Sequence, residues 1–252
     1  MTDSKTKEAI SQYRGGVLMI GSLFWDPSEI RHNWRSRHLK PLETAIDVQI
    51  PIRYGRISKS RDDTFTMVFS KEIEGGESMG RGKFLEFHGN PKSPEELINE
   101  GLELIKAECN TTELNFSVFN WSWGTIGIGL NPKTAISDKS GFGPFIEHWS
   151  NQYGRRKPLD PDEYKVGQEN RVITPSGILE IVWPRELTEI DYFITTLTKS
   201  GLTNYPSAEE IAKAMHDAKD RTYFENNVKY GILTFQDEQI ETVFNDLSEP
   251  QS

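Results

Sequence analysis

VLMIGSLFWDPSE (residues 17–29) is the stretch that decides how the fold begins. Its four leading apolar residues are too few for a helix and suit a short buried strand. Gly21 allows a sharp change of backbone direction. Asp26, Pro27 and Glu29 match the residue pattern that starts a helix, so we predict a strand, a tight turn and a helix. The N–H groups of such a turn can bind one anion, or the turn can be a structural connection only.

The composition of the whole chain is that of a globular protein. It has 252 residues, of which 35% are hydrophobic and 27% are charged, which is enough for a sizeable core. The formal net charge of −9 disfavours nonspecific binding to nucleic acid or to an anionic membrane. A single cysteine excludes an intramolecular disulfide framework and a cysteine-rich zinc site.

The chain shows no targeting or membrane signal. Its N-terminus has no apolar core of signal-peptide length. No apolar run approaches the roughly 20 residues that span a bilayer. We therefore predict a cytoplasmic protein with no nucleic-acid partner and no membrane partner.

The first 130 residues predict short strands interrupted by two helices. The clearer helix spans 93–109 and opens with a capping box at Ser93 and Glu96. Pro51 favours an edge strand or a bulge, and several glycines lie at bulge-like positions. This pattern favours an α+β fold with a small mixed, barrel-like sheet and flanking helices. The other expected strands are residues 46–58, 64–70, 82–87 and 116–130.

The sequence of the second half of the chain indicates additional structure packed on the core. We divide the sequence into a polar lead-in (1–15), a core (16–130), and a loop-rich excursion with a C-terminal α/β elaboration packed on that core (131–252). The remaining patterns predict strands at 177–184 and 228–235, a helix that opens with a capping box at Ser207 and Glu210, and an amphipathic helix at 237–247.

Proline, glycine and polar residues dominate the excursion at 131–176. They predict a long loop with at most a helical turn at 145–149. We expect part of this loop to cover the mouth of a pocket. The aromatic side chains available for docking it are Phe142, Phe145, Trp149 and Tyr153.

Several residue types that carry chemistry in other proteins lack the required context here. The five histidines lack the close helical spacing of metal ligands, so we predict no metal site. Cys109 lies on the apolar face of its helix, which favours an inert thiol over a nucleophile. The glycines of GTIGIG (124–129) do not match a phosphate-binding loop and favour strand bulges.

One acidic residue of the helix at 93–109 lies on its apolar side. On a wheel of about 100° per residue, Glu108 projects between Leu97, Leu104 and Ile105. A carboxylate at this position destabilises the fold, so we expect one there only if it pairs with a cation or has a catalytic role. Partial burial also raises its pKa, and a general base requires a raised pKa. The alternative is a helix-end glutamate that bends to solvent or pairs with an arginine. The expected centre of the apolar face is Ile98, Leu102, Ile105 and Cys109.

The order of these motifs resembles the gamma-glutamyl cyclotransferase family over residues 16–130. The segment Gly21-Ser22-Leu23-Phe24-Trp25-Asp26-Pro27 is similar to the family's Tyr-Gly-Ser loop, with Ile20 at the tyrosine position. IRYGRISKSR (52–61) resembles its Gly-Tyr-Arg segment, and GRGKFLEF (80–87) resembles its central glycine-containing strand. Glu108 in LIKAEC is the best match to the family's catalytic glutamate.

The resemblance implies an enzyme that releases 5-oxoproline from a γ-glutamyl amide without a metal or cofactor. Glu108 would take a proton from the substrate's α-amine as that amine attacks the γ-carbonyl, and would return it to the leaving amine. The turn would bind the α-carboxylate through the N–H groups of Gly21, Ser22, Leu23 and Phe24. The candidates for binding a second carboxylate are Arg53, Arg56 and Arg61, for each of which a surface salt bridge is the alternative.

A second interpretation is a non-catalytic binding or interaction protein that reuses the same fold and binds a small carboxylate ligand or a protein. Ile20 in place of the tyrosine and the unmatched residues 131–252 favour this interpretation. Glu108 on the apolar side of its helix favours the enzyme. The enzyme interpretation requires that Glu108 and the turn at Gly21 line one pocket.

Overall fold

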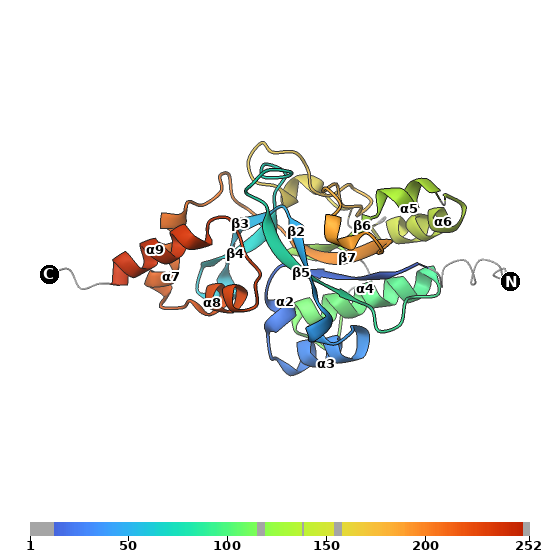
Figure 1. The fold of residues 1–252 in the computed structure, drawn as a ribbon, viewed down its shortest axis with the longest axis horizontal. Coiled ribbons are helices and arrows are strands. Elements are labelled where there is room, and N and C mark those ends of the chain that lie inside the picture. Colours follow the sequence, from blue (N-terminus) through green and yellow to red (C-terminus); the bar gives the residue numbers. More distant parts are fainter. Residues whose placement is uncertain (1–12, 115–118, 138, 154–157, 249–252) are drawn as a thin grey trace.

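A mixed five-stranded sheet forms the centre of the molecule (Figure 1). The computed structural model describes residues 13–114, 119–137, 139–153 and 158–248. The strand order in this part of the chain is β2-β5-β1-β7-β6. The strands are β1 (Gly15–Met19), β2 (Ile46–Ile50), β5 (Gly80–Glu86), β6 (Gly124–Leu130) and β7 (Tyr192–Thr198).

Strand β1 lies in the middle of the sheet. It runs parallel to β7 and antiparallel to β5, and all five of its residues are buried. Burial on both faces explains the uninterrupted apolar run at 17–19. The outer pairs, β2 with β5 and β6 with β7, are antiparallel. The structure confirms an α+β fold with a small mixed sheet and flanking helices, but the sheet of the described residues is open and forms no closed barrel.

A two-stranded ribbon follows the edge strand β2. It pairs β3 (Ile52–Ser58) with β4 (Thr64–Phe69), and a 3₁₀ turn, η2 (Lys59–Arg61), lies at its tip. The single strand expected at 46–58 is therefore two strands, because Pro51 has no N–H to continue a ladder. The register shifts between Tyr54 and Arg56, which is a bulge at Gly55.

The predicted strand, turn and helix at the N-terminus are present, with one correction. A short helix, α2 (Ser22–Trp25), forms the turn, and α3 (Glu29–His38) follows it. Ser28, and not Asp26, is the residue that precedes the first turn of α3. Asp26 instead accepts a hydrogen bond from the Ser28 N–H at 2.8 Å, so its carboxylate holds the connection between the two helices.

Helix α4 (Pro94–Cys109) matches its prediction closely. The Ser93 hydroxyl accepts a hydrogen bond from the Glu96 N–H at 3.2 Å. The buried side of the helix carries Leu97, Gly101, Leu104 and Ile105, so its centre lies nearer to Glu108 than we expected. Gly101 lets the helix approach Phe119, since a Cβ there would lie 2.7 Å from the ring.

The expectation of a loop over residues 131–176 is wrong for their first part. This part forms α5 (Pro132–Ser137) and α6 (Lys139–Ser150), which extend at one end of the molecule (Figure 1). Phe142 and Phe145 of α6 pack on Tyr192 of β7, with ring centroids 6.1 and 5.6 Å apart from it. Burial of these rings outweighs the poor helix propensity of the neighbouring glycines and Pro144.

Residues 158–191 have little regular structure, and the strand expected at 177–184 is absent. Only single bridges form there, Ile128 with Ile178 and Ile173 with Leu179. The strand that does form, β7, has no counterpart in the sequence prediction. The 3₁₀ turns outside the ribbon are η1 (Leu42–Thr44), η3 (Asn151–Tyr153), η4 (Pro161–Tyr164) and η5 (Arg185–Leu187).

Three helices gather at the C-terminal end of the molecule (Figure 1): α7 (Ala208–Ala218), α8 (Thr222–Lys229) and α9 (Asp237–Ser248). The capping box of Ser207 and Glu210 is confirmed, and α7 packs on both α9 and β4. The strand expected at 228–235 is wrong. Helix α8 runs to Lys229, and Gly231 then turns the chain with a φ of +71°.

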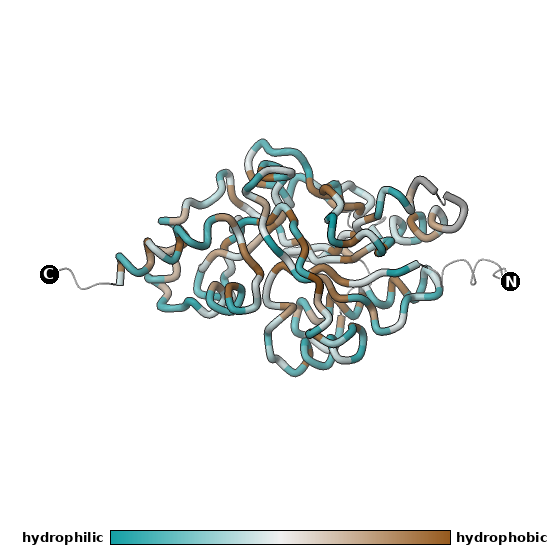
Figure 2. Tube along the Cα trace, in the orientation of Figure 1, coloured by the Kyte–Doolittle hydropathy of each residue, from teal (hydrophilic) through white to brown (hydrophobic). Residues whose placement is uncertain are grey.

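The apolar residues concentrate on the central sheet, and the outer faces of the helices are mostly hydrophilic (Figure 2). Side chains of β1, β5, β6 and β7 belong to one continuous buried cluster together with α4, α6 and α7. None of the helices in the described ranges combines the length and the apolar character that crossing a bilayer requires.

Candidate functional site

A cavity of about 830 Å³ brings together parts of the chain that are far apart in sequence. Its walls are the turn after β1, the tip of the β3–β4 ribbon, the last residues of α4 and the end of β7. Trp123 and Tyr223 complete it. The described residues that line the cavity are 20–23, 26, 31, 56–61, 66–69, 108–110, 123, 196–198 and 223.

Glu108 contributes a carboxylate to this cavity from the last turn of α4. It is half-buried, and the Thr196 hydroxyl of β7 donates a hydrogen bond to its Oε2 at 3.3 Å. Burial raises the pKa of Glu108 above the usual glutamate value, against the opposing effects of Arg31, the Thr196 hydrogen bond and Arg56. A carboxyl group with a raised pKa is suited to accept and return a proton near neutral pH.

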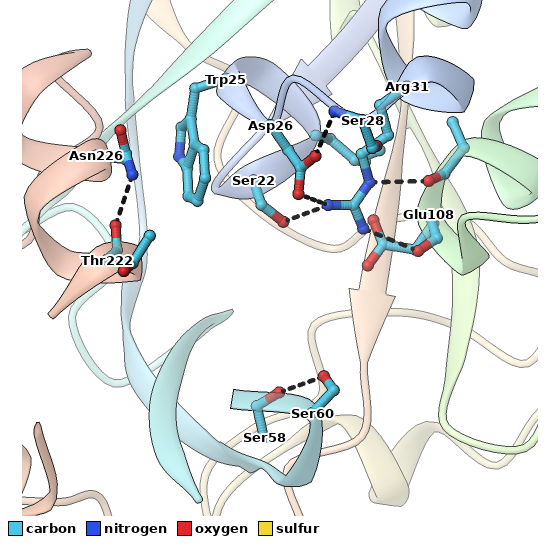
Figure 3. Close-up of polar contacts among 12 residues, drawn as sticks. Ser22, Trp25, Asp26, Ser28, Arg31, Ser58, Ser60, Glu108, Thr222 and Asn226 are labelled. Atoms are coloured by element: carbon cyan, nitrogen blue, oxygen red, sulfur yellow. Dashed lines mark hydrogen bonds and ion pairs between the residues drawn. The ribbon is translucent and has the colours of Figure 1, made fainter. Parts of the chain in front are cut away.

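Arg31 fixes the position of Glu108 through the backbone. Its Nε donates to the Ala107 carbonyl at 3.0 Å and its Nη2 donates to the Glu108 carbonyl at 3.1 Å. These carbonyls lie in the last turn of α4, where no following helical N–H remains to bond them; the Ala107 carbonyl also accepts from the N–H of Asn110, which ends the helix, at 3.3 Å. Arg31 Nη1 also contacts Asp26 at 2.6 Å and Ser22 at 3.2 Å (Figure 3). One guanidinium therefore ties the end of α4 to the turn at Ser22.

A second arginine of α3 supports the same turn. Arg35 donates to the carbonyl oxygens of Leu23 and Asp26, each at 2.7 Å. Arg31 and Arg35 are four residues apart on a helix, so they share one face. That face is buried, and the two side chains hold the turn in place from behind.

The turn itself presents Gly21, Ser22 and Leu23 to the cavity, but not Phe24. The Phe24 N–H donates to the Gly21 carbonyl at 3.0 Å and is used inside the turn. Its buried ring packs edge-on against Tyr230, with centroids 5.9 Å apart. Phe24 is therefore a packing residue. The N–H groups of Ser22 and Leu23 lie in the first turn of α2, which supplies no helical acceptor for them.

The tip of the ribbon gives the cavity a positive side. Arg56, Lys59 and Arg61 line it; within 4 Å none of the described carboxylates pairs with them, and the charges of Arg56 and Arg61 act on Glu108 in the same cavity. The Arg56 guanidinium lies 5.2 Å from the Trp123 ring, and the Arg61 guanidinium lies 4.8 Å from the Tyr223 ring. In a chain with a net charge of −9, this local excess of cations favours an anionic ligand.

Arg53 is not part of this site. It lies nearer the base of the ribbon, over the Tyr205 ring at 4.0 Å, and its Nη1 pairs with Glu72 at 3.1 Å. It lines a second cavity of about 610 Å³ instead. For Arg53, the salt bridge that we considered as the alternative is what the structure shows.

The structure thus brings together Glu108, Gly21, Ser22, Leu23, Arg56 and Arg61 among the predicted site residues, and excludes Phe24 and Arg53. Sequence reasoning missed Arg31, Thr196 and Tyr223. The spacing of Arg31 and Arg35 around the buried Trp34 was a usable signal for Arg31, because charged residues on a buried helix face have a partner. Thr196 and Tyr223 lie in the second half of the chain and carry no local signal.

The described residues of 131–176 contribute nothing to the cavity lining, so for this part of the segment the expectation that it covers the pocket mouth is wrong; residues 138 and 154–157 lie outside the described ranges. Its aromatic side chains pack elsewhere. Trp149 lies against Phe119, with centroids 4.6 Å apart. Burial of these aromatic rings beside β6 and β7 stabilises the sheet. The cavity is lined instead by the ribbon, Tyr223 of α8 and the other residues named above.

Other reactive groups near the cavity are few. Cys109 lines it, but burial raises the pKa of this thiol to about 11, so it is not a thiolate near neutral pH. Among the residues that the structure describes, no three histidine, cysteine or acidic side chains gather as metal ligands do.

Comparison of the chain with family models, with curated proteins and with solved structures found no match.

Proposed function

We propose that this protein is a gamma-glutamyl cyclotransferase-like enzyme that releases 5-oxoproline from a γ-glutamyl amide. The observation that carries the proposal is that Glu108, with its raised pKa, shares one cavity with the turn at Gly21. The two features lie about ninety residues apart in the chain, and the enzyme interpretation requires them to line one pocket.

The reaction needs one group that accepts and then returns a proton. The substrate's α-amine attacks its own γ-carbonyl carbon, forming the C–N bond of the five-membered ring. Glu108 takes a proton from that amine and gives it to the departing amine as the original amide bond breaks. The nucleophile is already part of the substrate, so the protein contributes positioning and proton transfer.

The substrate's charges match the distribution of charge in the cavity. The α-carboxylate fits the N–H groups of Ser22 and Leu23, with Ser22 held by Arg31 at 3.2 Å. An anionic group on the amine part of the amide fits the positive tip of the ribbon, where Arg56 and Arg61 have no ion pair with a described carboxylate. The single cysteine is consistent with action in the reducing cytoplasm, which remains part of the proposal.

The test is release of 5-oxoproline from a panel of γ-glutamyl amides by the wild type and two variants. Glu108→Gln keeps the volume of the side chain but cannot accept a proton. A positioned base is worth about 10²–10⁴-fold in rate, so we expect a loss of at least that range with the fold intact.

Glu103→Gln is the matched control on the same helix. Glu103 lies at the surface and pairs with Lys106 at 2.7 Å, an interaction with little energetic weight. We expect wild-type activity in this variant. Full activity of Glu108→Gln would remove the proposed mechanism.

The second candidate is a binding protein that uses the same cavity without turnover. The cations at the tip of the ribbon favour an anionic ligand in either case. A wild type that binds γ-glutamyl compounds but releases no 5-oxoproline from any of them would support this second candidate.

A further inference from the structure

Helix α8 brings one phenol hydroxyl to the cavity wall beside the turn. Tyr223 lines the cavity and is only 8% exposed. A Cβ at Gly21 would lie 2.5 Å from the Tyr223 oxygen, so glycine is the residue that lets the hydroxyl lie against the turn. This close approach places the hydroxyl beside Gly21, the residue before Ser22, at the turn where the proposed function puts the substrate's α-carboxylate.

The ring of Tyr223 is held on two sides. The Arg61 guanidinium lies 4.8 Å from its centroid, and the Trp25 ring lies 6.1 Å away. The Trp25 indole donates to Asn227, one turn further along α8, at 2.7 Å. Trp25 lies between the turn and the α8 residues Thr222 and Asn226 in Figure 3. The hydroxyl is therefore fixed relative to the turn.

The hydroxyl has a proton to donate. Its oxygen accepts a hydrogen bond from the Met67 N–H at 3.4 Å, and the Asn227 side chain is a second hydrogen-bonding neighbour; within the described ranges no hydrogen bond donated by this hydroxyl is found. Burial raises the pKa of Tyr223, so the hydroxyl stays protonated at neutral pH. A buried donor without an acceptor is costly, and a ligand oxygen in the cavity would satisfy it.

We propose that the Tyr223 hydroxyl donates a hydrogen bond to the α-carboxylate of the ligand bound at the Gly21 turn, which makes α8 a part of the binding site. The identity of this ligand rests on the proposed function. The hydrogen bond forms in the bound substrate as well as in the transition state, so Tyr223 contributes binding and not proton transfer.

The experiment compares the wild type, Tyr223→Phe and Tyr230→Phe. Tyr223→Phe keeps the ring and its contacts with Arg61 and Trp25. Tyr230→Phe removes a phenol hydroxyl just after α8, outside the cavity lining. Two probes are used: γ-glutamyl-alanine for steady-state kinetics, and 5-oxoproline, which keeps the α-carboxylate, for the dissociation constant by calorimetry.

In Tyr223→Phe we expect KM and the dissociation constant of 5-oxoproline to rise by about 10- to 100-fold, with kcat changed less than about threefold. Tyr230→Phe keeps the wild-type unfolding temperature and constants. Tyr223→Phe stays folded at the assay temperature but unfolds at a lower temperature than the wild type, because the buried Met67 N–H loses its acceptor at 3.4 Å. An unchanged KM and dissociation constant in Tyr223→Phe would overturn the proposal, as would a fall in kcat at constant KM.

The dissociation constant of 5-oxoproline distinguishes a failure of this proposal from a failure of the proposed function. If the wild type releases no 5-oxoproline but binds it, and Tyr223→Phe binds it more weakly, the enzymatic function fails and the role of Tyr223 stands. If Glu108→Gln is inactive and Tyr223→Phe matches the wild type, the enzyme stands and the role of Tyr223 fails. A wild type that binds neither probe overturns both.

Discussion

The contacts of Arg31 give a sharp prediction for the substitution Arg31→Met. Methionine keeps much of the apolar length of the side chain but removes every hydrogen bond that the guanidinium donates. The Asp26 carboxylate then loses its ion pair at 2.6 Å, and the carbonyls of Ala107 and Glu108 lose the hydrogen bonds from Arg31 at 3.0 and 3.1 Å. The turn and the end of α4 are no longer joined.

The expected cost follows from how little of this pair is exposed. The side chain of Arg31 is 10% exposed and that of Asp26 is 24% exposed. Removing one partner of a buried ion pair costs about 3–5 kcal/mol. Because Asp26 keeps partial access to water and the Ser28 N–H, we expect the lower end, a loss of about 3 kcal/mol in the free energy of unfolding.

Urea unfolding followed by circular dichroism measures this loss as a lower midpoint at an unchanged slope. Arg37→Met is the matched control, since Arg37 lies on the same helix but is exposed. It should change the free energy of unfolding by less than about 0.5 kcal/mol. An Arg31→Met protein as stable as Arg37→Met would refute the reasoning.

The same substitution has a second readout if Glu108 is the general base. Burial raises the pKa of Glu108, and the charge of Arg31 is the largest effect that opposes it. Removing that charge raises the pKa further. The acidic limb of the pH–rate profile of kcat should therefore move to higher pH in Arg31→Met, and an unmoved limb would argue against Glu108 as the titrating group.

Two pH-dependent predictions concern stability away from the cavity. The hydrogen bond of His38 Nδ1 with Glu100 at 2.8 Å raises the pKa of His38 above 6.5, its value in the unfolded chain. The pair therefore stabilises the folded state fully below pH 6.5. Its contribution is lost as the pH rises through the pKa of His38 in the folded state. Glu100→Gln should therefore lower the free energy of unfolding by about 1 kcal/mol near pH 6 and by nothing near pH 9, and an equal loss at both values would contradict this assignment. Burial raises the pKa of Asp237 from 3.8 to about 6, so the folded state keeps a proton that the unfolded state releases, and stability falls as pH rises from about 4 to about 6. The free energy of unfolding of Asp237→Asn, measured by urea titration at several pH values, should no longer fall between about pH 4 and about pH 6 through this group. If it falls as steeply as in the wild type, other groups cause the pH dependence.

The features that could be predicted from the sequence were those set by neighbouring residues. The capping box at Ser93 and the apolar period of the next sixteen residues gave α4 nearly residue by residue. Glu108 was found because a charged residue on an apolar helix face is unusual in any fold. The turn at Gly21 was found because strand, glycine and helix-start signals lie side by side.

The features that could not be predicted depend on contacts between distant residues. Strand β7 has an apolar pattern, but its importance comes from pairing with β1 and β6, and nothing within 192–198 states those partners. Helix α6 contains Pro144 and two glycines, which argue against a helix until the burial of Phe145 and Trp149 is known. Tyr223 reaches the cavity only because Trp25 and Asn227 fix α8 beside the turn.

The position of the cavity follows from the one parallel strand pair among the described residues. Val17 of β1 lies opposite Ile194 of β7, and both strands end a few residues later at the same edge of the sheet. Ligands bind at the carboxyl ends of parallel strands, because the connections that leave this edge diverge and open a crevice. Ile20 and Gly21 follow β1 at this edge, and β7 ends there with Thr196 to Thr198. Both groups of residues line the cavity. The Thr196 hydroxyl donates a hydrogen bond to the Glu108 carboxylate. The site is therefore built by a strand from the second half of the chain inserted beside β1, and residues 16–130 hold only part of it.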